Sequence, residues 1–485
     1  MALKRFSIDL ASLSAGRIVQ TVAAFLALPI VARLLGPHEY GLVAVAMSFV
    51  MCTIFMADAG LGQSLVRTAA SDRVTWSSAF WMISGFGGLL SLVLVAIAFA
   101  APLVFGEPRL QGLLLGLAIV PLIVSAISAP TADMQQRQKF RELAAIEGAS
   151  ALMGLGVAIT LAFQGAGAWA LVLQQVAFWV MKALLITWRT RFRPTLEFST
   201  ANLAEHTRFA RDTLGTTLLY FFGRQLDPLV IGRFLGAAPA GLYAFATRVM
   251  NLPNQLVASP VQNALFVRMV ELRDDKAALR DLLLILTTAV ALLVFPAVAT
   301  LAAASPAYFT FLLSEEWLLA APVFAILAPV AAVQTILVPA NALLLATGRT
   351  NVRLRQTFEM AVLWVILLPL STPFGLLAVA GAFTAVNLLY LPRSLRLTLP
   401  AVDLRIIDFL AILGPASVAA LGICASHAVL RAYLHMSDPQ EILASLGELA
   451  IAYSVLLISC RGQLAGQIRT LRTLMVRSAG PAATS

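Results

Sequence analysis

The sequence predicts an all-α membrane protein with about fourteen spanning helices, because it combines high hydropathy, little charge and many long apolar segments. Of its 485 residues, 60% are hydrophobic and only 12% are charged, against about 25% charged residues in soluble domains. The mean hydropathy is +0.88, and several apolar segments are ~20 residues long, the length of a helix that crosses hydrocarbon. Backbone polar groups must be satisfied internally in lipid, so these segments are expected to be helical.

Fourteen candidate spans follow one another along the chain, each an apolar run bounded by polar or basic residues. Their expected ranges are 12–32, 42–63, 78–101, 111–132, 145–164, 169–188, 212–232, 242–262, 282–304, 321–346, 357–373, 375–391, 407–430 and 443–460. An alternative interpretation of the same pattern has twelve spans followed by two helices that lie along the membrane surface.

The basic residues indicate how these spans are oriented. If the N-terminus is cytoplasmic and the spans alternate, the cytoplasmic segments hold 26 of the 34 Lys and Arg residues. The outer loops hold only Arg33, Arg109, Arg233 and Arg431. This is the positive-inside pattern of membrane proteins, and an even number of spans predicts two cytoplasmic termini. The same loops explain the net charge of +10, so nucleic acid is not an expected partner.

A short motif is repeated in the two halves of the chain. ARLLGPHEYGL at 32–42 and GRFLGAAPAGL at 232–242 share five residues at an offset of 200 positions. Six predicted spans separate the copies, so both enter the membrane in the same direction and the repeat is parallel. We therefore expect an N-lobe at 1–190, a cytoplasmic linker at 191–211, a C-lobe at 212–392, and two extra helices with a basic tail at 393–485. The repeated glycines are expected to shape turns; they are Gly36, Gly41, Gly236 and Gly241.

Motifs for enzymatic chemistry are absent from the sequence. It has no GxxxxGK[ST] phosphate-binding loop. Cys52, Cys424 and Cys460 lie far apart in apolar segments, without a CxxC motif or a disulfide framework. The four histidines show no metal-ligand spacing. We therefore expect a protein that is not an enzyme and that holds no metal or organic cofactor.

Polar residues inside the spans are the best candidates for function, because charge in the bilayer is costly and normally faces a bundle interior or a watery cavity. Three polar stripes at helical spacing fall in the first, seventh and eighth spans. They consist of Ser14, Arg17, Gln20 and Thr21; of Thr217, Tyr220, Arg224 and Asp227; and of Arg248, Asn251, Gln255, Ser259 and Gln262. The 200-residue offset makes the first two equivalent faces of the two lobes. We expect all three stripes to line a central cavity between the lobes.

Arginines in this cavity predict a substrate that carries phosphate, because a guanidinium group matches phosphate oxygens with its fork of donors. Arg17, Arg224 and Arg248 are the candidates. Two other interpretations stay open: Asp227 neutralises Arg224 from three residues away, or Arg17 extends to the cytoplasmic surface. The remaining candidates for substrate contact are Gln20, Tyr220, Asn251 and Gln255.

Two acidic residues are candidates for coupling to a proton or sodium gradient. They are Asp58 and Asp227. Asp58 is an equally good partner for an arginine such as Arg17. Lys182, near the inner end of its span, is expected to extend towards the membrane surface.

Two stretches carry a family resemblance. PIVARLLGPHEYGLVAVAMSFV at 29–50, with MADAGLGQSLVR at 56–67, is the first. LDPLVIGRFLGAAPAGLYAFATRVMNLPNQLVASPVQNALFVRMVELRDD at 226–275 is the second. Both resemble the polysaccharide-transporter family of the multidrug/oligosaccharidyl-lipid/polysaccharide (MOP) superfamily, which includes Wzx-type flippases. The resemblance covers about 1–400.

The resemblance implies two six-helix lobes around a central cavity that work by alternating access. It implies a flippase of the bacterial inner membrane that moves undecaprenyl-pyrophosphate-linked oligosaccharide to the periplasmic leaflet, for exopolysaccharide or lipopolysaccharide synthesis. The implied partners are this glycan lipid, the bilayer, and a polysaccharide polymerase with its chain-length machinery. Two alternatives remain. A drug antiporter of the superfamily would show more cavity carboxylates than arginines, and a glycan polymerase or ligase would carry a long outer loop.

Overall fold

The computed structural model describes residues 2–58, 65, 72–190, 192–199, 203 and 225–476, with side chains from residue 28 onward except at 58, 263, 264, 472, 475 and 476. Every regular element in these ranges is a helix, as predicted. The chain divides into two compact units, Met1–Ala244 and Phe245–Ser485. The lobe and linker boundaries expected from the repeat stay a prediction.

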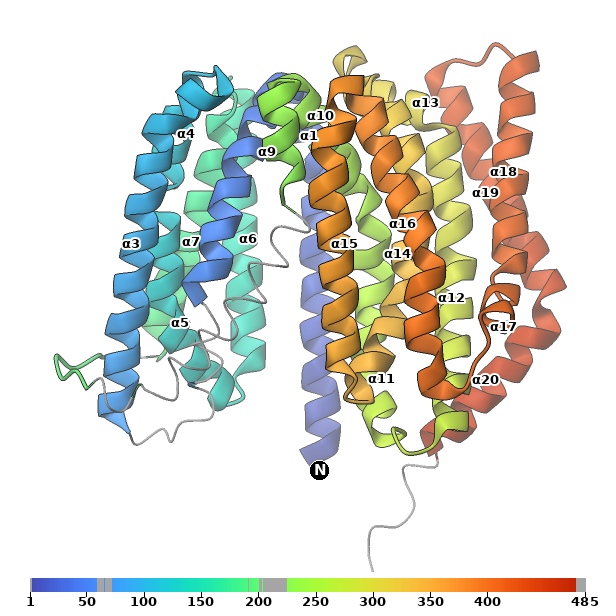
Figure 1. The fold of residues 1–485 in the computed structure, drawn as a ribbon, viewed down its shortest axis with the longest axis horizontal. Helices are drawn as coiled ribbons and strands as arrows, with labels where there is room; N and C mark the ends of the chain where they lie inside the picture. The colour runs from blue at the N-terminus through green and yellow to red at the C-terminus, as the bar shows by residue number, and fades with distance from the viewer. Residues whose placement is uncertain are drawn as a thin grey trace, which may run out of the picture. The chain divides into compact units, whose positions relative to one another are not determined.

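The first unit is built from long helices that lie side by side (Figure 1). The helices α3 and α5 pack together, and α6 packs against α7 and α1. The described helices are α1 (Ala2–Asp58), α3 (Arg73–Phe105), α4 (Arg109–Leu117), α5 (Val120–Gln136), α6 (Phe140–Phe163), α7 (Trp169–Thr190) and α9 (Asp227–Phe234), with the first part of α10 (Ala237–Met250).

The second unit packs around α12 and α14, whose buried leucines meet residues of α18 and of the segment before it. After α10 comes a π-helical turn, Asn254–Ala258. The helices that follow are α11 (Ser259–Glu271), α12 (Lys276–Ala303), α13 (Ser305–Leu312), α14 (Ala320–Ala346), α15 (Thr350–Ser371), α16 (Leu376–Thr398), α17 (Ile406–Ala411), α18 (Gly414–Tyr433), α19 (Asp438–Ser459) and α20 (Arg461–Val476). Short 3-10 turns lie at Glu315–Trp317, Thr372–Phe374 and Leu399–Val402.

Eleven helical segments of the described residues are long and apolar enough to cross a membrane. This confirms the multi-pass, all-α class, while the exact number of fourteen stays a prediction. The predicted seventh span lies partly outside the described residues, since 212–224 are not among them. The two extra C-terminal spans coincide with α18 and α19, which are among the eleven segments.

Local chemistry explains where several helices begin and end. Asp72 accepts a hydrogen bond from the backbone N–H of Thr75 at 3.0 Å and so caps α3. The helix ends at Gly106, whose φ of 70° is left-handed. Ser437 and Gln440 form a capping box at the start of α19. The helix boundaries follow from these polar residues between apolar runs.

Candidate functional site

The repeated motif forms a turn in each copy. The backbone of α1 leaves helical geometry at Gly36, where φ is 73°. The equivalent Gly236 has a φ of 97° between α9 and α10. Residues other than glycine rarely adopt such angles, so the expectation that these two glycines shape turns is confirmed.

The other two repeated glycines have a different role, and the expectation of turns at Gly41 and Gly241 is wrong. Both lie within helices, and they face each other where the two copies of the motif meet. A Cβ on Gly41 would overlap the carbonyl oxygen of Ala237, and a Cβ on Gly241 would overlap that of Pro37. Each added Cβ would also lie 2.8 Å from the backbone nitrogen of the other glycine. We call this reciprocal backbone contact the glycine junction; it lies within the first unit.

Only the first copy of the motif carries a polar anchor. Glu39 forms an ion pair with Arg109, whose Nη2 lies 2.8 Å from Oε2. The same carboxylate accepts a hydrogen bond from the backbone N–H of Ala168 at 2.8 Å. The equivalent position in the second copy is Pro239, which has no side-chain acceptor. Glu39 therefore ties the first turn to the ends of α4 and α7.

The two acidic coupling candidates are differently placed. Asp227 is the first residue of α9, is buried, and interacts electrostatically with the phenol of Tyr243. Asp58 is the last residue of α1, and its side chain lies outside the described ones. Neither arrangement tests coupling, so both assignments stay predictions.

The third polar stripe lies at the end of α10 and beyond it. Arg248 and Gln255 are exposed, and Asn251 is half-buried, while Val249 and Met250 are buried. Asn251 donates a hydrogen bond to the carbonyl of Thr247 at 2.8 Å. The polar residues therefore occupy the face of this segment that does not enter the core of the second unit.

A π-helical turn interrupts this stripe at Asn254–Ala258. Such turns are rare and often occur at functional sites, because the wider turn leaves backbone groups in an altered register. Prolines at 253 and 260 flank it, and neither can donate a backbone hydrogen bond. The break in helical register is a feature that the 3.6-residue spacing used for the sequence prediction cannot show.

Four of the predicted cavity residues cannot be placed by their side chains. The backbone of Arg17 and Gln20 is helical, in α1, and their side chains lie outside the described ones. Tyr220 and Arg224 lie outside the described residues altogether. The cavity assignment of these residues stays a prediction.

Lys182 has partners that the sequence analysis did not identify. Its Nζ lies 2.9 Å from Oε2 of Glu147 on the neighbouring helix α6, and 4.9 Å from the ring centre of Trp179. The side chain is only 14% exposed. A carboxylate and an aromatic face within the helix pair therefore hold the ammonium group, and its extension towards the membrane surface stays a prediction.

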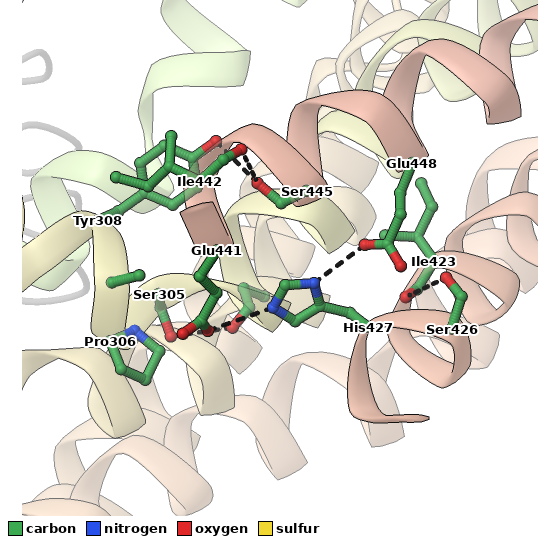
Figure 2. A network of polar contacts seen from close by, with 12 residues as sticks. Ser305, Pro306, Tyr308, Ile423, Ser426, His427, Glu441, Ile442, Ser445 and Glu448 are labelled. Carbon is green, nitrogen blue, oxygen red and sulfur yellow. Dashed lines mark hydrogen bonds and ion pairs between the residues drawn. The ribbon is translucent and has the colours of Figure 1, made fainter. Parts of the chain in front are cut away.

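A group of ionisable residues in α18 and α19 was missed by the sequence analysis. His427 lies between Glu441 and Glu448, and Figure 2 shows its ring directed at both carboxylates. The signal was available, because His427 and Glu448 interrupt predicted apolar spans, and Glu441 and Glu448 are seven residues apart on one helix face. It was not used because the histidines were considered only as metal ligands and as members of a catalytic grouping.

The architecture and the repeated turn define a multi-pass, all-helical membrane protein with an internal repeat. The chain is similar in structure to the lipid II flippase MurJ in an inward closed conformation, with a TM-score of 0.72, 15% identity, and 95% of this chain and 99% of that chain covered. It is also similar to an inward-facing multidrug resistance MATE transporter of the MOP superfamily, with a TM-score of 0.59 and 16% identity over 81% of this chain and 94% of that chain.

Sequence comparison gives the family. Residues 30–322 match the polysaccharide biosynthesis protein family, and the chain belongs to it. The succinoglycan biosynthesis transport protein ExoT of Rhizobium meliloti is 29% identical over 63% of this chain and 62% of its own length. The lipopolysaccharide biosynthesis protein WzxC of Escherichia coli is 24% identical over 67% of this chain and 66% of its own length. The chain thus spans less than two thirds of these relatives. The resemblance seen in the sequence is confirmed.

Proposed function

We propose that this protein is a flippase that moves lipid-linked oligosaccharide from the cytoplasmic to the periplasmic leaflet of a bacterial inner membrane. The observation that carries the proposal is the combination of the family match over 30–322 with the MOP fold of the whole chain. Relatives named for polysaccharide transport and biosynthesis support it. The absence of catalytic motifs from the sequence agrees with transport and not with glycan synthesis.

The proposed substrate carries an undecaprenyl pyrophosphate. Arg248 supports this, because it is exposed on a polar face that also holds Asn251 and Gln255. A guanidinium group binds phosphate oxygens through two parallel hydrogen bonds, and the neighbouring amides suit sugar hydroxyls. Arg17 and Arg224, with Gln20 and Tyr220, complete the proposed lining on the other stripes. The polyprenyl tail would stay in lipid while the head group crosses.

The same proposal includes the orientation of the chain in the membrane and the proteins that act on the glycan after it. The positive-inside distribution supports two cytoplasmic termini. A flipped repeat unit must next be joined to others on the periplasmic side, so a polymerase and chain-length machinery are the proposed partners. Asp58 and Asp227 are the proposed sites of proton or sodium coupling.

The test is a deletion of the gene, followed by measurement of lipid-linked oligosaccharide in the membrane and polymer at the cell surface. We expect single repeat units to accumulate on the cytoplasmic face and the polymer to be lost. Repeat units accessible on the periplasmic face would instead assign the protein to polymerisation or ligation. Normal levels of both would contradict the flippase and favour a small-molecule antiporter.

Complementation of the deletion tests the arginines. Arg248→Ala and Arg224→Ala are each expected to lower polymer export about tenfold or more at unchanged protein level, because a hydrogen bond to a charged group contributes about 1.5–3 kcal/mol. Arg461→Ala is the matched control, since Arg461 is an exposed arginine at the start of α20. Normal export by both cavity variants would refute the arginine-lined cavity and leave the flippase itself standing on the deletion result.

A further inference from the structure

We infer that His427, Glu441 and Glu448 form a proton-binding site inside the α18–α19 pair. We call these three residues the His–Glu cluster. Its ligand is a proton and not a metal ion or a glycan. The cluster lies outside the repeated motif and outside the three polar stripes, so the inference does not depend on the proposed function.

The geometry of the cluster is that of a bridging imidazole. Nδ1 of His427 lies 2.9 Å from Oε2 of Glu448, and Nε2 lies 3.3 Å from Oε1 of Glu441. The His427 side chain is 2% exposed, and each glutamate side chain is 9% exposed. Both ring nitrogens are therefore used by carboxylates in an environment nearly closed to solvent.

Counting protons shows which charge this geometry carries. Each of the two N···O contacts needs one proton, which is satisfied by an imidazolium between two carboxylates, or by a neutral imidazole and one carboxylic acid. In either case the cluster has a net charge of −1, since one positive and two negative groups, or one negative group alone, remain. An uncompensated charge in a low-dielectric interior is costly, and such groups normally neutralise by binding a proton.

One atom is free to take that proton. Oε1 of Glu448 is buried and has no hydrogen-bond partner among the residues that the structure describes. A proton added to this oxygen makes the cluster neutral: one O–H bond forms on Glu448, and one O–H bond breaks in the hydronium ion that delivers the proton and becomes water. The unpartnered oxygen thus marks the position of the exchangeable proton.

Among the residues that the structure describes, the helices packed against the cluster place no compensating positive charge beside it. The helix α12 packs against both α18 and α19 and has no ionisable residue from Leu282 to Ala303. On α13, the hydroxyl of Tyr308 lies 3.1 Å from the hydroxyl of Ser445 on α19. Figure 2 shows this contact. The arginines of α20 begin at Arg461, at the opposite end of α19 from Glu441.

Other titratable groups lie on the cluster's own two helices and on the connection between them, where His435 is exposed. On α18, Cys424 interacts electrostatically with Glu448, and Arg431 is exposed at the last turn. On α19, Asp438 accepts a hydrogen bond from Thr310 at 2.6 Å, and the hydroxyl of Tyr453 donates to the carbonyl of Leu293. None of these supplies a buried cation to the cluster.

A metal ion does not fit this arrangement. The imidazole is in direct hydrogen-bond contact with both carboxylates, so it occupies the position where a cation would lie between them. No group of three or more metal-binding side chains is found in the part of the chain that the structure describes. A proton needs no further space.

The cluster also lies within reach of water at one end of the pair. Glu441 is in the first turn of α19, directly after the connection 434–437 that joins the two helices. Glu448 is two turns deeper on the same face, about 10 Å along the axis. Protons can therefore enter at Glu441 and reach Glu448 through the imidazole, whose two nitrogens connect the carboxylates.

The test is infrared difference spectroscopy of the full-length protein in lipid vesicles between roughly pH 5 and 8, the range in which histidine-linked sites change charge. We expect a carbonyl band of a buried carboxylic acid that disappears as the pH rises and shifts in deuterated water. Glu448→Gln should remove this band, and Glu441→Gln should move its midpoint. Glu315→Gln, at an exposed glutamate in a 3-10 turn, is the matched control and should leave the band unchanged.

Two results would overturn the inference: a wild-type spectrum without a titrating carboxylic acid, or a band that Glu448→Gln leaves unchanged. If Glu448→Gln does not fold, nitrogen NMR of labelled histidine in the wild-type protein decides the matter. A proton site requires the ring signal of His427, assigned with His427→Gln, to change with pH across the same range. A ring signal that stays constant throughout identifies a static ion-paired clamp and contradicts the proton site.

Discussion

The glycine junction and the His–Glu cluster hold helices together by opposite means. At the junction, Gly41 and Gly241 let two backbones approach without any side chain between them. In the α18–α19 pair, three ionisable side chains fill the space between the helices. Small residues at close crossings are a common solution in lipid, where burial of apolar surface gives no advantage over contact with acyl chains. Contacts between ionisable side chains stabilise a helix pair only while every residue of the group is present.

This difference predicts how each region fails. Removing a member of the cluster leaves a buried charge without its partner, whereas adding an atom at the junction only forces two backbones apart. The first change should lower the free energy of unfolding much more than the second.

His427→Leu is expected to be the most damaging change. It leaves Glu441 and Glu448 buried without the imidazole, and breaking a buried ion pair typically costs about 3–5 kcal/mol. The thermal midpoint of the purified protein measures this loss.

A triple variant provides the control. His427→Leu with Glu441→Met and Glu448→Met removes all the ionisable groups together, and replacing a whole buried ionic group by apolar side chains of similar volume is often neutral. We expect the triple variant to be more stable than His427→Leu alone. A triple variant as unstable as the single one would show that the packing of the ring matters more than the charges.

The two regions also differ in what the sequence could predict. Most of the described helices were visible as apolar runs, and the turns at Gly36 and Gly236 followed from the repeated motif. The role of Gly41 and Gly241 was not visible, because a glycine that shapes a turn and one that permits a crossing look the same in a sequence. Only the folded chain shows that each faces the backbone of the other copy.

The ionic contacts were predicted less well, because they join residues that are far apart in the chain. The partner of Lys182 was not foreseen, because Glu147 lies on α6, 35 positions earlier. His427 was tested as a metal ligand and not as a neighbour of glutamates. The polar stripe at Arg248 stays a prediction as a cavity lining, and its interruption by a π-helical turn was not foreseen. Helical spacing predicts which residues share one face of a helix. It does not predict which residue of another helix lies opposite that face.

Gly41→Ala and Gly241→Ala are expected to have intermediate effects. Each added methyl group overlaps a backbone carbonyl oxygen that cannot rotate away, and overpacking of this kind costs about 1–3 kcal/mol. The reciprocal geometry predicts similar losses for the two variants. Gly85→Ala is the matched control, because a Cβ there meets nothing within 4 Å. Thermal midpoints compared in the same detergent test this, and unequal losses would show that the junction is not symmetric in energy.

Glu39→Gln is expected to have the smallest effect, and it probes the one polar contact that distinguishes the two copies of the motif. The amide oxygen can still accept the hydrogen bond from Ala168, so the variant mainly loses the ion pair with Arg109. Arg109 is 53% exposed, and ion pairs near solvent contribute about 0–1 kcal/mol. The loss should shrink further at high salt, because salt screens exposed charges.

Glu39→Ala separates the two contacts of this side chain. It also removes the acceptor for the backbone N–H of Ala168, a buried residue, and an unsatisfied buried donor costs about 1–3 kcal/mol. We therefore expect Glu39→Ala to be less stable than Glu39→Gln, with a difference that does not depend on salt. If the two variants are equally stable, the first turn does not need the hydrogen bond between Glu39 and Ala168. The first copy of the motif would then be like the second, which has Pro239 at this position, and the glycine junction alone would hold the repeat together.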